Sequence, residues 1–179
     1  TSETALISLG GVVALEAVRL GSFEIDAAIQ GFVRREYGIA IGERTAEEIK
    51  VAIGSAAPTD DENRAEVRGR ELMSGLPKTV ILDPAEVRSA INEPVQTIVD
   101  SVVSCLGQAP PELAQDLIHE GITLVGGGGM LRGLDARLAA ATDIPVRLVD
   151  APLECVVRGA GHCIEPYDVL KTMFMDARS

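Results

Sequence analysis

Four consecutive glycines, Gly126 to Gly129, follow a short apolar run in the segment ITLVGGGGMLRGL. Glycine loses more backbone entropy on folding than any other residue, so an ordered run of four needs a reason. A tight strand-to-helix turn explains one or two of them. Backbone amides that closely approach an anion or a flat ring explain all four. The run therefore predicts a nucleotide or phosphate site, with a plain turn as the alternative.

The glycine run departs from two well-known phosphate loops. A P-loop ends in Lys followed by Ser or Thr, where this chain has Met130 and Leu131. The dinucleotide pattern G-x-G-x-x-G needs a third glycine at an offset where none falls. The spacing alone therefore leaves the kind of ligand open.

The first residues, TSET, gather hydroxyl groups and a carboxylate ahead of a predicted hairpin. The hydroxyls of Thr1 and Ser2 can hydrogen-bond phosphate oxygens, and the Glu3 carboxylate can hold a Mg²⁺-bound water. The alternative is the polar end of an ordinary strand. A second candidate pair, Glu47 and Lys50, is three residues apart on a predicted helix and therefore shares one face. Its alternative is a surface ion pair worth about 0.2–1 kcal/mol.

The helices and strands that must position these residues are predicted from the spacing of apolar residues and from the glycines and prolines that end each element. Helix ends are marked by capping boxes at Thr45 with Glu48 and at Asp83 with Glu86, and Pro94 is expected to kink the longest helix. The predicted strands are 3–9 and 12–19, joined at Gly10-Gly11, then 65–73, 78–82, 122–125 and 146–149. The predicted helices are 24–37, 45–53, 84–106, 110–120, 131–141 and 152–164. Strand and helix alternate in the second half, which predicts an α/β fold with helices covering a sheet.

Composition excludes several classes of protein. A net charge of -11 argues against a nucleic-acid partner, which needs a clustered basic face. No apolar run reaches the roughly 18 to 20 residues of a membrane span. The three cysteines lack the spacing of metal ligands and are expected to be reduced core residues. Neither His119 nor His162 is expected to bind metal. The sequence therefore predicts no metal ligand. The chain starts without Met, which suggests a piece of a longer protein.

Several blocks in series resemble one family. TSETALISLGG, IAIGERTAEEIKVAIGSA, EVRGRELMSGLPKTV, PPELAQDLIHEGITLVGGGGMLRGLD and APLECVVRGAG are similar to MreB, the bacterial actin homologue. The resemblance covers essentially the whole chain and points to the second half of that family, subdomains IIA and IIB. It implies an actin-like ATPase (RNase-H-like) subdomain at 1–41 and 89–179, with a small α+β insertion at 42–88.

The resemblance also implies roles for single residues. Gly126, Gly127, Gly128 and Gly129 would pass under the adenosine of ATP or ADP, and Glu47 and Lys50 would flank the base and ribose. Thr1 and Ser2 fall in the second phosphate loop, which the family writes Asp-Ile-Gly-Gly-Gly-Thr-Thr-Glu. Ser2 and Glu3 would act in catalysis, Ser2 by positioning the attacking water, with Mg²⁺ accompanying the nucleotide.

Two positions depart from the family pattern. Ser22-Phe23 stands where the family has Gly-Asp, and Ala52 stands where it has Glu. Phe23 lacks an oxygen and is apolar, so we expect it to turn away from the cleft and pack near Ala27 on the helix that it introduces.

As a whole, the resemblance implies part of a filament-forming ATPase that maintains rod shape by organising cell-wall synthesis. The parent would hydrolyse ATP slowly, and this piece alone would be inactive. Its partners would be further filament subunits, a RodZ-like membrane adaptor and cell-wall elongation proteins. The protein would lie in the cytoplasm at the inner face of the plasma membrane, and it would contact the membrane only through the other half. The alternatives are a sugar-kinase or heat-shock-chaperone ATPase, and a nucleotide-binding module that does not polymerise.

Overall fold

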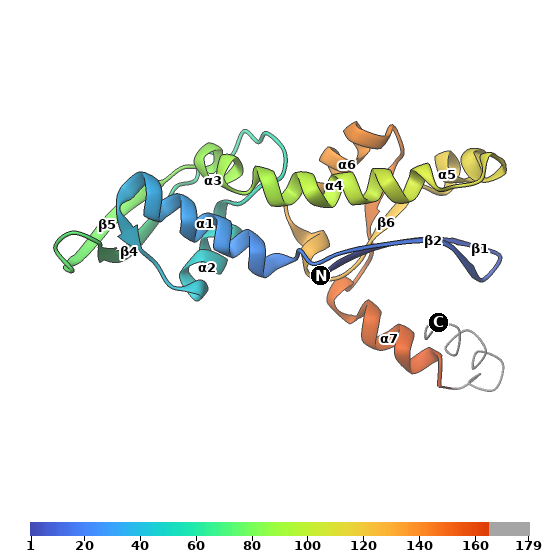
Figure 1. Cartoon of the computed structure of the whole chain (residues 1–179), viewed down its shortest axis with the longest axis horizontal. Helices are drawn as coiled ribbons and strands as arrows, with labels where there is room; N and C mark the ends of the chain where they lie inside the picture. The colour runs from blue at the N-terminus through green and yellow to red at the C-terminus, as the bar shows by residue number, and fades with distance from the viewer. Residues whose placement is uncertain (165–179) are drawn as a thin grey trace.

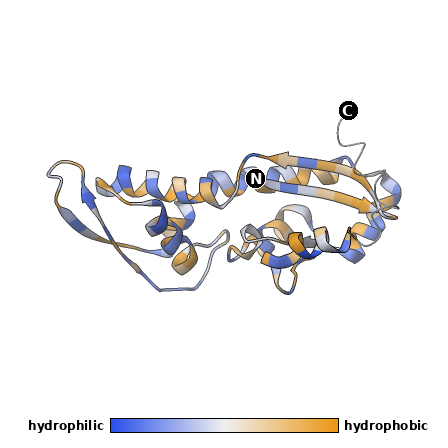
Figure 2. Ribbon diagram, turned by 90° about the horizontal axis from the view of Figure 1, so that it is seen from below, coloured by the Kyte–Doolittle hydropathy of each residue, from blue (hydrophilic) through white to orange (hydrophobic). Residues whose placement is uncertain are grey.

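The computed structural model describes residues 1–164 and begins with an antiparallel hairpin, β1 (Ser2–Ser8) against β2 (Gly11–Val18). The turn residues Leu9 and Gly10 have φ angles of 50° and 77°, the left-handed values that two-residue hairpin turns favour. The predicted hairpin is therefore confirmed, with its turn one residue before Gly10-Gly11. Both strands of the hairpin carry hydrophobic segments, coloured orange in Figure 2. Leu6 and Ala14 are buried on the side of the helix α4 (Asn92–Gly107), whereas Ile7, Val13 and Leu15 are exposed.

The next group of elements surrounds a small antiparallel sheet in the order β3-β4-β5. The elements are α1 (Ser22–Tyr37), β3 (Ile39–Ala40), α2 (Glu43–Ile53), β4 (Ala65–Glu71) and β5 (Pro77–Leu82). The capping box predicted at Thr45 is wrong, because α2 begins two residues earlier with Gly42 as its N-cap and no side-chain cap. Gly42 has an extended backbone, which lets the chain enter the helix before Thr45 is reached.

The longest predicted helix is two helices, α3 (Pro84–Ala90) and α4 (Asn92–Gly107), separated at Ile91. The capping box of Asp83 and Glu86 at the start of α3 is confirmed. In one continuous helix the Pro94 ring would clash with the carbonyl of Ala90, four residues earlier. The break at Ile91 instead places Pro94 in the first turn of α4, where proline is tolerated.

A parallel strand pair forms the last layer, with β6 (Ile122–Leu124) beside β7 (Val146–Leu148) and the helix α6 (Leu134–Thr142) between them in the chain. The remaining elements are the helices α5 (Ala114–Glu120) and α7 (Cys155–His162) and the 3-10 turns η1 (Pro111–Leu113), η2 (Gly128–Met130) and η3 (Pro152–Glu154). The helix predicted from residue 131 therefore begins three residues later, at Leu134.

One large apolar core joins most of these elements. It includes Ile29 and Val33 of α1, Ile49 of α2 and Val95 of α4, all of them buried. In the chain as drawn in Figure 1, α1 lies against α2 at one end, while the hairpin lies along α4 at the other. The division into 1–41 with 89–179 and an inserted 42–88 remains a prediction.

The cysteines differ in their surroundings. Cys105 is buried between α4 and the hairpin, as predicted, whereas Cys155 and Cys163 are only half-buried, so these two are not core residues. Within residues 1–164, no helix is both long and apolar enough to cross a membrane.

Candidate functional site

The four glycines are not equivalent. Gly126 has a φ of 78°, a conformation that favours glycine. A Cβ at Gly127 would lie 3.2 Å from Leu153, and one at Gly129 would lie 3.3 Å from both Leu124 and Leu148. A Cβ at Gly128 would meet nothing within 4 Å. The fold therefore gives a reason for three of the glycines and none for Gly128, which faces open space.

The glycine run is not the N-terminus of a regular helix. It enters the 3-10 turn η2, in which the Met130 amide donates to the Gly127 carbonyl and the Leu131 amide to the Gly128 carbonyl. The helix α6 starts only after Gly133, whose φ is 71°. The Gly126 amide donates to the Pro152 carbonyl at 2.9 Å, so the run is also held against η3.

Arg132 joins the glycine loop to the end of α2. Its Nη2 donates to the Ala52 carbonyl at 2.6 Å and its Nε to the Gly54 carbonyl at 3.2 Å. Its Nη1 lies 2.8 Å from Asp61 Oδ2, and the Ala56 amide donates to the Arg132 carbonyl at 2.7 Å. A cation at the last carbonyls of a helix is favourable, since these groups have no partner within the helix. These contacts bring together the two segments that the nucleotide hypothesis needs, the glycine run and α2.

Sequence reasoning missed Arg132. Its bonds reach residues about 80 positions away, for example 80 to Ala52 and 71 to Asp61. No local sequence pattern marks such a residue. The one available signal is general: the last carbonyls of any helix, here α2, need hydrogen-bond donors from elsewhere. The Asn63 backbone amide and, to a smaller extent, Arg132 lower the pKa of Asp61, which favours the charged partner.

Glu47 and Lys50 have different surroundings. Lys50 Nζ lies 2.8 Å from Oδ1 and 3.0 Å from Oδ2 of Asp26 in α1, and its directed hydrogen bond goes to Oδ2. The Lys50 and Asp26 side chains are 11% and 12% exposed. Glu47 is exposed on α2. In this arrangement only Glu47 is free to meet a ligand, because the Lys50 ammonium is held by α1.

The residues at the start of β1 do not form one cluster. The Ser2 hydroxyl donates to the Leu20 carbonyl at 2.8 Å, so its proton is already engaged. Successive side chains of a strand point to opposite faces, which separates Ser2 from Glu3. Thr1 and Glu3 are exposed. A Cβ at Gly21 would lie 2.9 Å from the Thr1 nitrogen, so the start of the chain lies directly against the start of α1.

The prediction that Phe23 packs on α1 is wrong, although Phe23 does lie near Ala27, four residues along the same helix, as predicted. Phe23 is 61% exposed near the start of α1. The buried stripe of that helix runs through Ile25, Ile29 and Val33. Phe23 lies two positions before Ile25, about 200° around the helix axis, and therefore shares the solvent face with Ala27.

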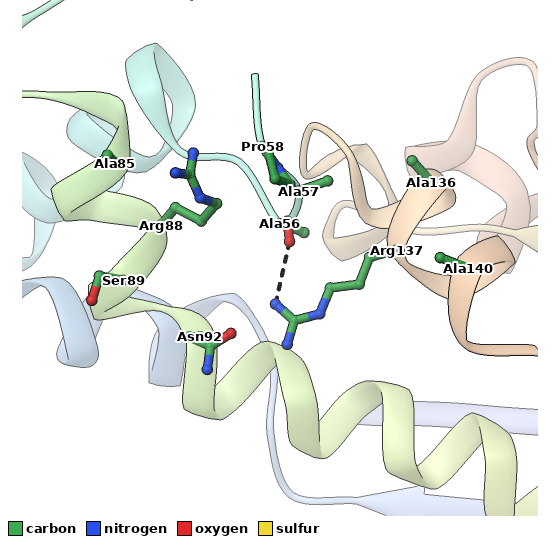
Figure 3. A pocket seen from close by; sticks show the side chains of 10 residues that line it. All are labelled: Ala56, Ala57, Pro58, Ala85, Arg88, Ser89, Asn92, Ala136, Arg137 and Ala140. Atoms are coloured by element: carbon green, nitrogen blue, oxygen red, sulfur yellow. Dashed lines mark hydrogen bonds between the residues drawn. The ribbon is translucent and has the colours of Figure 1, made fainter. Parts of the chain in front are cut away.

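Two hollows lie on the described part of the chain with walls that include neither the glycine run nor Glu47 nor Lys50. One lies between the segment 56–58, the α3–α4 junction and α6, with Arg88 and Arg137 reaching in from opposite walls (Figure 3). The predicted nucleoside residues therefore line neither of these two hollows. Within residues 1–164 there is also no group of three or more His, Cys, Asp or Glu side chains suited to hold a metal ion.

Comparison with known sequences gives the family. The MreB/Mbl protein family model matches residues 1–172. The cell shape-determining protein MreB of Escherichia coli is 48% identical over 169 residues, which are 94% of this chain and 49% of that protein. The cell shape-determining protein Mbl of Bacillus subtilis is 36% identical over 170 residues, 95% of this chain and 51% of that protein.

Comparison with solved structures gives the fold. MreB5 of Spiroplasma citri bound to ADP has a TM-score of 0.88 at 33% identity, over 92% of this chain and 50% of that one. The same protein bound to AMPPNP has a TM-score of 0.86 at 31% identity, over 98% and 52%. The MamK double helical filament, at 19% identity over 76% of this chain and 42% of that one, has a TM-score of 0.58 and supports the fold alone.

The strands, covering helices and structural neighbours define an actin-like α/β protein. The chain belongs to the MreB/Mbl family. It spans about half the length of the curated relatives that it matches, 49% of one and 51% of the other. These shares give no position within the relatives, so the assignment to the second half of the family remains a prediction.

Proposed function

We propose that the full-length protein binds ATP and ADP and assembles into actin-like filaments that determine cell shape. The two curated relatives described above are cell shape-determining proteins, and the Spiroplasma relative is bound to ADP in one structure and to AMPPNP in another. No sugar kinase or chaperone is among these relatives, which favours the cytoskeletal function over the two alternative ATPases.

The nucleotide-binding proposal rests mainly on the open space beside Gly128. Its neighbours Gly126, Gly127 and Gly129 have conformational or packing reasons to be glycine, and Gly128 has none within the described residues. A ligand lying on the backbone supplies the missing reason, because a flat base or ribose needs the space that a side chain would fill. Arg132 keeps this loop beside α2, where exposed Glu47 can approach the same ligand.

The other predicted ligand contacts need local changes. Lys50 would reach a ribose only if its ammonium left Asp26, so we propose that the ion pair mainly fixes α2 against α1. Ser2 would donate to phosphate oxygens only if its hydroxyl left the Leu20 carbonyl, whereas Thr1 is exposed and would need no such change. Ser2 and Glu3 remain our candidates for a catalytic role, which requires the phosphates to reach the start of β1.

Magnesium fits this chain only as a companion of the nucleotide. Mg²⁺ prefers octahedral oxygen ligands and keeps several waters, typically with one or two carboxylates and the substrate phosphates. Glu3 is the one carboxylate of the TSET segment, and it is exposed. We propose that Glu3 contacts a Mg²⁺-bound water while phosphates supply the direct ligands. The metal neutralises phosphate charge when bound.

The wider role is part of the same proposal. Filament subunits would be the main partners, with a RodZ-like membrane adaptor and cell-wall elongation proteins at the inner face of the plasma membrane. Hydrolysis would be slow. Residues 1–179 alone would show little turnover, because half of a nucleotide cleft does not exclude water from the reacting phosphates.

Sedimentation of the full-length protein tests this function. We expect the protein to pellet with ATP, to bind labelled ADP with one site per chain, and to hydrolyse ATP without a sugar acceptor. Filament formation without nucleotide binding would contradict the ATPase proposal. Nucleotide binding without pelleting would favour the module that does not polymerise, and turnover that requires a sugar would favour the kinase.

A further inference from the structure

A hollow of about 500 Å³ lies between α6 and the α3–α4 junction (Figure 3), and its lining does not include the glycine run. Ligand pockets in proteins typically measure about 300–1,000 Å³ and combine an apolar lining with a few polar groups. Here small apolar side chains line the hollow, among them Ala57, Ala85, Ala136 and Ala140. The polar groups are Ser89, Asn92 and two arginines.

The two arginines differ in how they are occupied. Arg137 donates from Nη1 to the Ala56 carbonyl at 3.2 Å and from Nη2 to Gln96 Oε1 at 2.7 Å, which ties α6 to α4 and to the segment before Pro58. Arg88 is half-buried, and within residues 1–164 its guanidinium has no hydrogen-bond or ion-pair partner. A guanidinium carries five donors, so Arg88 can bind an anion without breaking any contact.

Nearby carboxylates do not neutralise Arg88. Asp61, Glu62 and Asp83 line the adjoining hollow together with Arg88 and a second arginine, Arg64. Glu62 is exposed, and within residues 1–164 it forms no ion pair with Arg88. Asp61 is committed to Arg132 at 2.8 Å, and Asp83 caps α3 by accepting from the Glu86 amide at 2.9 Å. Arg88 is therefore a half-buried positive charge without an ion-pair partner among residues 1–164, in a chain whose net charge is -11. A negatively charged ligand would complement it.

We propose that this hollow binds a small organic anion, with its carboxylate or phosphate group on Arg88 and a short apolar or aromatic body against the alanines. Arginine suits such a group because its planar fork matches carboxylate and phosphate geometry. The walls come from α6 on one side and the α3–α4 junction on the other, so an occupant holds these elements together. None of the residues that line the hollow belongs to the proposed nucleotide-binding set, although Ala56 also bonds to the Arg132 carbonyl.

Phenyl phosphate provides a direct probe, because it combines the phosphate with an apolar ring. Its binding to the full-length protein can be followed by saturation-transfer difference NMR with saturating Mg²⁺-ADP present, so that any nucleotide site is already filled. We expect saturable binding with a dissociation constant of about 1 mM. Inorganic phosphate should compete weakly, and benzyl alcohol, which lacks the charge, should not bind.

Two variants and a matched control make the test decisive. Arg88→Gln should weaken binding about tenfold, because a hydrogen bond to a charged group is lost. Ala140→Leu, which fills the hollow without changing charge, should weaken it too. Arg68→Gln removes the same charge from exposed β4 and should leave binding unchanged. Absence of saturable binding, an unchanged affinity in Arg88→Gln, or an equal loss in Arg68→Gln would each overturn the proposal.

Discussion

Lys50 and Asp26 form a nearly buried ion pair between α2 and α1, with 2.8 Å between Nζ and Oδ1 and side chains only 11% and 12% exposed. The opposite charges of the two side chains compensate each other at an interface that also contains apolar residues such as Ile29 and Ile49. Taking either charge away would leave the other without compensation in a poorly solvated place. The pair therefore fixes how the two helices sit together.

Asp26→Ala should lower the free energy of unfolding by about 3 kcal/mol, at the low end of the cost of breaking a buried pair. Urea denaturation followed by circular dichroism measures this. The double variant Asp26→Leu with Lys50→Met should regain much of the loss, since no uncompensated charge remains. Arg44→Ala breaks the exposed pair with Glu48 and should cost less than about 1 kcal/mol. Equal effects of Asp26→Ala and Arg44→Ala would show that the buried pair is unimportant.

Arg132→Met should loosen the end of α2 while leaving most of the core intact. Hydrogen bonds to the Ala52 and Gly54 carbonyls would be lost, at a cost of about 1–3 kcal/mol. Hydrogen exchange should become faster at residues 52–57, and ADP affinity should fall because the glycine loop is no longer held beside α2. Arg158→Met, which removes an exposed pair with Glu154, is the control. Unchanged exchange at residues 52–57 would show that Arg132 does not hold the loop.

Tyr37 predicts a specific response to alkaline pH. Its hydroxyl donates to Glu86, and this hydrogen bond, helped by burial, raises the pKa of Tyr37 to about 12 from an ordinary value of 10.0. A raised folded-state pKa means that the protonated form contributes stability, fully present below pH 10 and lost as pH rises toward 12. The thermal midpoint should therefore fall more steeply between pH 10 and 12 in the native protein than in Tyr37→Phe. Parallel curves for the two proteins would contradict this assignment.

Local patterns predicted much of this fold. Two β-rich runs joined at Gly10-Gly11 predicted the hairpin β1–β2. Asp83 with Pro84 and Glu86 predicted the start of α3. Each of these signals acts within a few residues, so no tertiary information is needed.

The misses have tertiary or geometric causes. The Thr45 capping box had a competitor in Gly42, and Pro94 acted through a carbonyl four residues earlier, which broke the helix at Ile91 instead of kinking it. Phe23 was expected to be covered because it is apolar, but its neighbour Ala27 is itself exposed and offers only a methyl group to pack against. For the candidate site, the glycines were visible in the sequence, whereas Arg132 and Asp26 act across 80 and 24 residues and leave no local trace.

Nucleotide binding at the glycine run is tested most directly by Gly128→Val in the full-length protein, with labelled ADP affinity and thermal midpoint measured on the same samples. Gly31→Val, on the exposed side of α1 with equally open space, is the matched control, and Gly126→Val should lower the midpoint because its φ is 78°. We expect Gly128→Val to bind ADP at least about tenfold more weakly, a loss of roughly 1.4 kcal/mol, at an unchanged midpoint. Unchanged affinity at an unchanged midpoint would mean that the glycine run is only a turn.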